Sequence, residues 1–109
     1  MNKQDLINRL STLPGEIYLA EMAIFEAQDG VSKAKDVLSD KEADLYAEGK
    51  IDGKNAEIRT SQLKQRTTFE RNDIAKAENA LSMARISFNQ LQNTFIAYRA
   101  IAAMLKAGE

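Results

Sequence analysis

The fold of this chain is decided by residues 74–105, which read IAKAENALSMARISFNQLQNTFIAYRAIAAML. Apolar side chains recur in this stretch at alternating spacings of three and four residues. That spacing predicts a long α-helix with one apolar seam of the coiled-coil kind. The seam runs without exception through ten positions: Ile74, Ala77, Leu81, Ala84, Phe88, Leu91, Phe95, Tyr98, Ala102 and Leu105.

A second stretch earlier in the chain repeats the pattern. It continues through Gly30, which costs a helix about 1 kcal/mol relative to Ala, and only Lys41 interrupts it. We expect one helix with a weak point at Gly30, because the seam keeps its phase there. Its apolar positions are Ile17, Ala20, Ile24, Ala27, Val31, Ala34, Leu38 and Leu45.

Helix-breaking residues at 13–15 and a polar, glycine-containing stretch at 49–54 divide the chain into segments, and a third signal at 107–109 ends the last segment. Pro14 suits the first turn of a helix, where its missing N–H costs nothing, and this predicts helices over 3–12 and 14–48. The polar stretch 49–54 predicts a hairpin loop, followed by a helix over 55–107 that Asp52 or Asn55 could cap. A Thr-x-x-Glu pattern at Thr67 has the form of a capping box and predicts a kink or a restart of the helix near 67.

These segments predict an all-α fold, with a short N-terminal helix before a long antiparallel helical hairpin. Pairing outward from the loop places Ile17 near Phe88, and the N-terminal helix could fold back to cover 95–105 with Leu6 and Leu10. Residues 1–49 carry a net charge of −5 and residues 50–109 a net of +4. The two halves could therefore attract each other, or attract a second copy head to tail.

The composition narrows the chemistry. The 109 residues suit one domain, 1–109, and include no Cys, no His and one Pro. Without His or Cys the chain lacks an imidazole base, a thiolate nucleophile and the usual zinc ligands. We expect no enzyme, no catalytic residues, no metal site and no cofactor. The most apolar window, 95–105, is too short to span a bilayer, so a cytoplasmic location and no membrane partner are expected.

Many apolar residues lie off the two seams and predict self-association. A single hairpin would leave this second face in water, and large exposed apolar surfaces normally mark an interface. The alternative is a compact three-helix monomer. For an oligomer, we expect Ile86, Ile96, Ile101 and Met104 at the interface. The whole second face comprises Leu19, Met22, Phe25, Val37, Tyr46, Phe69, Met83, Ile86, Ile96, Ile101 and Met104.

The best candidate binding site is a basic tract at the hairpin tip. Lys54, Asn55 and Arg59 lie near a helix N-terminus, which favours anions, and Arg66 lies seven residues after Arg59 on the same face. A phosphate-bearing ligand is one interpretation. The other is ordinary helix capping with surface charges that balance the acidic first half. Duplex DNA is not expected as a partner, because the helices are too long for a helix-turn-helix and the tract is only modestly basic.

The tract from Ile51 to Arg59, followed by Gln62 and Leu63, resembles a pattern in small helical phage and prophage accessory proteins of unassigned role. That resemblance implies that Asn55 and Arg59 act as a structural or functional pair. The order of helices also resembles phage anti-defence proteins that sequester cyclic oligonucleotide signals. This likeness is architectural and assigns no ligand residue.

Together these observations predict a non-enzymatic, phage-type accessory or anti-defence protein that acts by stoichiometric binding. It could sequester a cyclic or linear oligonucleotide at oligomer junctions, or bind a host protein. The alternatives are a structural or adaptor coiled coil that docks on a host or phage protein, and a nucleic-acid-binding accessory protein.

Overall fold

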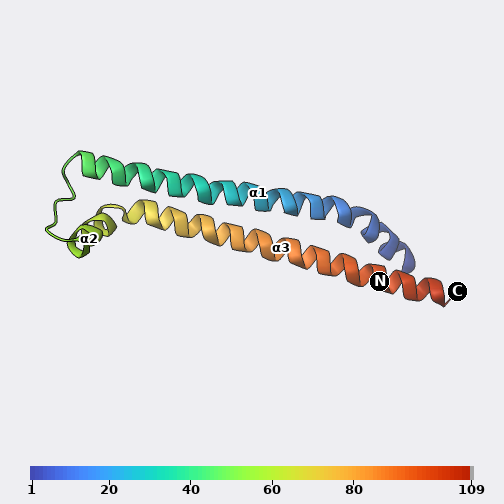
Figure 1. Cartoon of the computed structure of the whole chain (residues 1–109). Helices are drawn as coiled ribbons and strands as arrows, with labels where there is room; N and C mark the ends of the chain where they lie inside the picture. Colours follow the sequence, from blue (N-terminus) through green and yellow to red (C-terminus); the bar gives the residue numbers. More distant parts are fainter. Residues whose placement is uncertain (109) are drawn as a thin grey trace. The chain divides into compact units, whose positions relative to one another are not determined.

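The computed structural model describes residues 1–108, and this part of the chain contains three α-helices and no strand. They are α1 over Lys3–Ala47, α2 over Ala56–Arg66 and α3 over Thr68–Ala107 (Figure 1). The predicted all-α fold is confirmed. None of the described helices combines the length and apolar character that crossing a bilayer requires.

The predicted boundary between helices 3–12 and 14–48 is wrong, because α1 passes through Pro14 without ending. A proline inside a helix removes one backbone hydrogen bond and generally costs about 3 kcal/mol. Leu6 and Leu13 are buried and share the three-and-four spacing of the seam beyond Pro14, so their packing offsets this cost. The ribbon of α1 bends in its blue N-terminal part, as expected near a proline (Figure 1).

The helix predicted over 55–107 is interrupted at Thr67, where the sequence predicted a kink or restart. The chain forms α2 and α3 instead, and Thr67 lies between them with φ −124° and ψ 24°. Two other details of the prediction are confirmed. Asn55 caps α2, and α1 continues through Gly30.

Both predicted seams are confirmed by burial. Every seam position of α3 from Ile74 to Ala102 is half-buried, and only Leu105 at the end is exposed. In α1 the seam residues from Ile17 to Leu38 are half-buried and Leu45 is buried, whereas Lys41 is exposed. The core is thus one narrow apolar stripe along each long helix.

The described chain divides into two compact units. Unit 1 comprises residues 1–26 and 82–108, and unit 2 comprises Ala27–Leu81. In unit 1 the two helical segments run antiparallel, because Leu10 shares a groove with Ala102 while Ile17 shares one with Phe95. In unit 2 the end of α1, the connecting loop, α2 and the start of α3 pack together.

The register in unit 1 differs from the prediction by about two helical turns, because Ile17 lies with Phe95 rather than with Phe88. Ile17 lines a groove with Gln92 and Phe95, beyond its predicted neighbour Phe88. The prediction assumed a six-residue connection, but α2 lies within it and moves the pairing along α3. Leu6 contributes to grooves near 101–106, as predicted, but as part of α1 rather than of a helix that folds back.

Candidate functional site

Unit 2 begins with a well-formed end of α1. Gly49 has φ +72°, a left-handed conformation that glycine adopts without strain. Its N–H donates to the carbonyl of Tyr46 at 3.1 Å, and the N–H of Lys50 donates to the carbonyl of Leu45 at 3.0 Å. This is a Schellman motif, which satisfies carbonyls that the helix would otherwise leave unpaired.

An ion pair follows directly at the same helix end. The Lys50 ammonium lies 2.8 Å from the Glu48 carboxylate. The hydrogen bond and charge of Lys50 lower the pKa of Glu48 below its usual range. Both side chains are exposed, so we expect the pair to contribute little to stability.

The loop before α2 is closed by hydrogen bonds to that helix. The Asn55 side-chain oxygen accepts from the N–H of Ile58 at 2.9 Å and caps α2. Arg59 donates to the Gly53 carbonyl at 3.1 Å, while Gln62 accepts from the Gly53 N–H at 3.0 Å. Gly53 is therefore held on both of its backbone polar groups.

Gly53 is also a place of close approach. A Cβ at this position would lie 2.5 Å from Cγ2 of Ile58 and 3.1 Å from the backbone nitrogen of Arg59. A Cβ essentially never lies as close as 2.5 Å to another heavy atom, so a side chain here would have to displace Ile58. The loop thus depends on glycine for space, and Gln62 secures it further by donating to Asp52 at 2.9 Å.

The break between α2 and α3 is centred on Thr67, which is fully buried. Its hydroxyl donates to the Leu63 carbonyl at 2.6 Å and accepts from Nε of Arg71 at 2.9 Å. The Arg71 guanidinium also lies 3.8 Å from the Glu42 carboxylate of α1. This chain of polar contacts ties α1, α2 and α3 together within unit 2.

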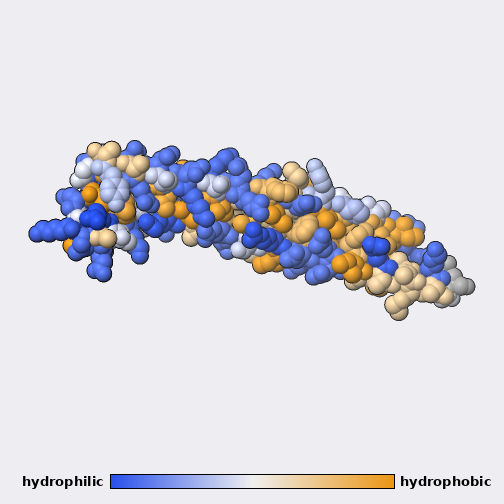
Figure 2. All heavy atoms as spheres, viewed as in Figure 1, coloured by the Kyte–Doolittle hydropathy of each residue, from blue (hydrophilic) through white to orange (hydrophobic). Residues whose placement is uncertain are grey.

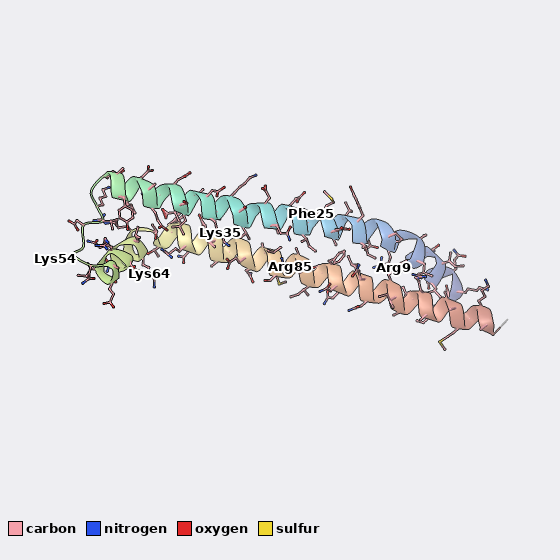
Figure 3. All side chains as sticks on the ribbon, viewed as in Figure 1. Arg9, Phe25, Lys35, Lys54, Lys64 and Arg85 are labelled. Carbon is pink, nitrogen blue, oxygen red and sulfur yellow. The ribbon has the colours of Figure 1, made fainter. Side chains whose placement is uncertain are left out.

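The four predicted ligand residues divide into two kinds. Asn55 and Arg59 are engaged by the loop and α2, so they have a structural role in this conformation. Lys54 and Arg66 are exposed, and neither has a hydrogen bond or ion pair to the described chain. Figure 3 places Lys54 on the loop beside α2, which carries Lys64. Whether these cations bind a ligand stays a prediction.

Unit 1 has a different surface, dominated by exposed apolar side chains. Of the sixteen large hydrophobic residues exposed in residues 1–108, twelve lie in unit 1. The predicted interface residues are among them, with Ile96 63% and Met104 74% exposed. Figure 2 shows hydrophobic side chains gathered over these segments. The twelve are Met1, Ile7, Tyr18, Leu19, Met22, Phe25, Met83, Ile86, Ile96, Ile101, Met104 and Leu105.

Apolar grooves open on unit 1 between its helical segments. One of about 390 Å³ is lined by Met1, Asn2, Lys3, Leu6, Ile101 and Leu105. Two further grooves define the surface described next. One, of about 360 Å³, is lined by Pro14, Ile17, Gln92, Phe95 and Ile96. The other, of about 310 Å³, lies towards the end of the seam. It is lined by Lys3, Leu6, Ile7, Leu10, Ala102, Leu105 and Lys106.

The helical repeat places further residues in line with those that line the grooves. Residues seven apart lie on one face of a helix in such a pair. Ile7 and Pro14 therefore align with Glu21, and Gln92 aligns with Arg85 and Arg99. Tyr18 and Phe25 follow four residues after Pro14 and Glu21 and adjoin this row. We call this surface the groove side; it comprises Ile7, Pro14, Tyr18, Glu21, Phe25, Arg85, Gln92, Ile96 and Arg99.

Some charged side chains of unit 1 form ion pairs and others have no partner of opposite charge among the described residues. Arg9 forms an ion pair with Glu16 within α1, on positions that lie off the groove side. Glu21 and Arg85, by contrast, make no hydrogen bond or ion pair with the described residues. Arg99 lies over the Phe95 ring, 5.7 Å from its centroid, and has no carboxylate partner in that part of the chain.

Sequence reasoning missed two of these features. The Thr67–Arg71–Glu42 contacts were hidden because they depend on how three segments meet. The groove side could have been found from the heptad spacing of Pro14 and Glu21, and of Arg85, Gln92 and Arg99.

Comparisons with protein-family models, curated proteins and solved structures found no match to this chain.

Proposed function

We propose that this chain is a stoichiometric binding protein whose working surface is the apolar surface of unit 1. One observation carries the proposal: twelve large hydrophobic side chains are exposed there. Contiguous apolar patches of more than a few hundred Å² are rare on monomeric proteins and mark interaction sites. An adaptor or structural role, in which helices pack on helices, fits this surface best.

The low charge of unit 1 supports this choice. Residues 1–26 and 82–108 contain nine charged side chains, against twenty-one in Ala27–Leu81. Interface cores are depleted in charged residues and enriched in aromatic residues and Met. Tyr18, Phe25, Met22 and Met104 are of these types and are exposed.

The hairpin tip supports an oligonucleotide ligand less well. Two of the four predicted ligand residues, Asn55 and Arg59, use their polar groups within the chain. Lys54 and Arg66 alone would give a weak phosphate site, because exposed cations act mainly through screened charge. A phage-type protein that sequesters a nucleotide signal therefore remains the rival hypothesis.

A retention experiment separates these two hypotheses. The tagged wild-type protein would be expressed in its native host beside two variants, the double substitution Ile86→Asp with Met104→Asp, and Lys54→Ala with Arg66→Ala. Both variants alter exposed side chains, so neither should disturb the fold. The retained material would be analysed by native mass spectrometry.

We expect a protein partner at integer stoichiometry that the tip variant retains and the unit 1 variant loses. The same partner, once purified, should raise the melting temperature of the wild-type chain. Retention of a nucleotide that only the tip variant loses would overturn the proposal. A protein partner lost by the tip variant alone would overturn it as well.

A further inference from the structure

The groove side of unit 1 combines an open apolar surface with charges of opposite sign on its two helical segments. Ile7, Tyr18 and Phe25 of α1 and Ile96 of α3 are each at least half exposed on it. Its central groove, about 360 Å³, is filled by no side chain of unit 1. The surface therefore has both the shape and the apolar character to accept another helix.

The charges on this side are arranged by helix. Its central charges are Glu21 from α1 and Arg85 and Arg99 from α3. Lys106 continues the basic row of α3 at the end of the surface, where Lys3 of α1 also lines the groove. None of the three central charges has a carboxylate or cation partner among residues 1–108. In Figure 3 the labelled Phe25 and Arg85 show the two segments of unit 1 from which these groups come.

We propose that a second copy of this chain packs on the groove side as a symmetric dimer. This inference rests on the proposed function, because the groove side is part of the apolar surface of unit 1, and it identifies what would cover that part. A two-fold axis parallel to the helices lays α1 of each copy over α3 of the other. Glu21 of one copy then lies level with Gln92 of its partner, between the Arg85 and Arg99 side chains of the basic row, and the same arrangement forms twice.

Charge complementarity favours a second copy over an unrelated helix. An unrelated partner would have to carry an apolar face with an acidic edge for α3 and a basic edge for α1. A second copy presents both at the required place, because its own groove side is identical. The Coulomb attraction also opposes packing α1 on α1, which would bring two Glu21 carboxylates together.

The available area is also sufficient. The part of α1 within unit 1 extends about 36 Å at 1.5 Å per residue, and two adjacent helices are about 20 Å wide. A face of this size presents on the order of 800 Å² per copy, which is the area that a standard interface buries on each partner.

The first test uses purified protein and multi-angle light scattering. We expect the wild type at twice 12.1 kDa and Ile96→Glu largely at 12.1 kDa, with dimer affinity at least tenfold weaker. Met104→Glu is the matched control, because Met104 is more exposed than Ile96 but lies five residues beyond Arg99, well off the groove side. It should leave the dimer intact.

The second test reverses charges. Glu21→Arg and Arg85→Glu should each weaken the dimer several-fold, because each places like charges against each other. An equimolar mixture of the two variants should form a heterodimer more tightly than either variant forms a homodimer, since both contacts are then restored. Native mass spectrometry would count the three species.

Three results would overturn this inference. They are a wild-type chain that is monomeric at high micromolar concentration, an assembly that Met104→Glu dissociates and Ile96→Glu does not, and charge variants that gain nothing on mixing. None of these bears on the proposed function, because the retention experiment reads a partner other than the chain itself. Loss of that partner would likewise leave a measured dimer standing.

Discussion

Unit 1 and unit 2 are of similar length but are stabilised in different ways. Unit 2 closes its chain reversal with specific polar contacts: the Asn55 cap, the Arg59 bond to Gly53 and the Thr67–Arg71 pair. Unit 1 relies on the apolar seam and has one internal ion pair among its described residues, Arg9–Glu16. The polar contacts of unit 2 fix its conformation, whereas an apolar seam alone leaves part of the apolar surface of unit 1 exposed.

The difference shows where each unit uses its side chains. Unit 2 has more than twice the charged residues of unit 1 and exposes only four large hydrophobic side chains in the described chain. We infer that unit 2 mainly specifies the fold and that unit 1 mainly provides the surface for binding.

The largest expected effects come from replacing one buried leucine in each unit. Leu13 is fully buried in unit 1 and Leu45 is 3% exposed in unit 2. Replacing either by Ala should lower the free energy of unfolding by about 3 kcal/mol, through lost burial and the cavity left behind. Urea denaturation followed by circular dichroism at fixed protein concentration measures this.

Leu19→Ala is the control for this pair, because Leu19 is 67% exposed. It should change the free energy by less than about 0.5 kcal/mol. If Leu13→Ala lowered the free energy of unfolding no more than Leu19→Ala, α1 would not be packed near Pro14. Unit 1 would then not be stabilised by its apolar seam, and the contrast with unit 2 would fail.

The next largest effect should be a gain in stability at Pro14. Because Pro14 lies inside α1, Pro14→Ala restores a backbone hydrogen bond and should stabilise the chain by about 1–2 kcal/mol, less than the full cost because α1 already bends. Thermal unfolding measures the gain. A helix that began at Pro14 would instead lose stability on this substitution.

Gly30→Ala provides a comparison in unit 2. An added Cβ at Gly30 would meet no atom within 4 Å, so the gain should be about 1 kcal/mol from helix propensity alone. A gain at Gly30 with a loss at Pro14 would show that the first segment is a separate helix after all.

The seams could be predicted from sequence because they depend only on spacing. Ala77 and Phe88 have little in common chemically, yet both are half-buried as their positions require. The boundary predicted at Pro14 is wrong because the apolar seam outweighs the preference of proline for the first turn of a helix. Leu6, Leu10 and Leu13 already continue that seam at spacings of four and three.

The site was predictable only where its contacts are local. The Asn55 cap spans three residues, and the sequence identifies it. The approach of Arg71 to Glu42 joins residues on either side of a chain reversal. That reversal contains α2 and is longer than the predicted six-residue loop. Register along α3 depends on that same length, so it could not be deduced from the seams alone.

Thr67 gives a smaller test of how unit 2 is fixed. Thr67→Val keeps the shape but removes the hydroxyl that joins Leu63 to Arg71, and should cost about 1–2 kcal/mol because buried partners lose their bonds. Thr68→Val is the neighbouring control, since its hydroxyl contacts are exposed. Equal small losses would mean that packing alone, as in unit 1, holds this break.

The smallest expected effect is a pH dependence at the end of α1. Lys50 lowers the pKa of Glu48, so their attraction contributes stability above the ordinary Glu value of 4.5 and is lost as pH falls through the lowered value. Lys50→Gln should return the Glu48 midpoint to its ordinary range in a carboxyl NMR titration, and Lys54→Gln should not.

If both substitutions moved the midpoint equally, the general positive charge of the tip would set it rather than the 2.8 Å pair. The polar contacts of unit 2 would then be less specific than their geometry implies, and unit 2 would differ from unit 1 mainly in its number of charges.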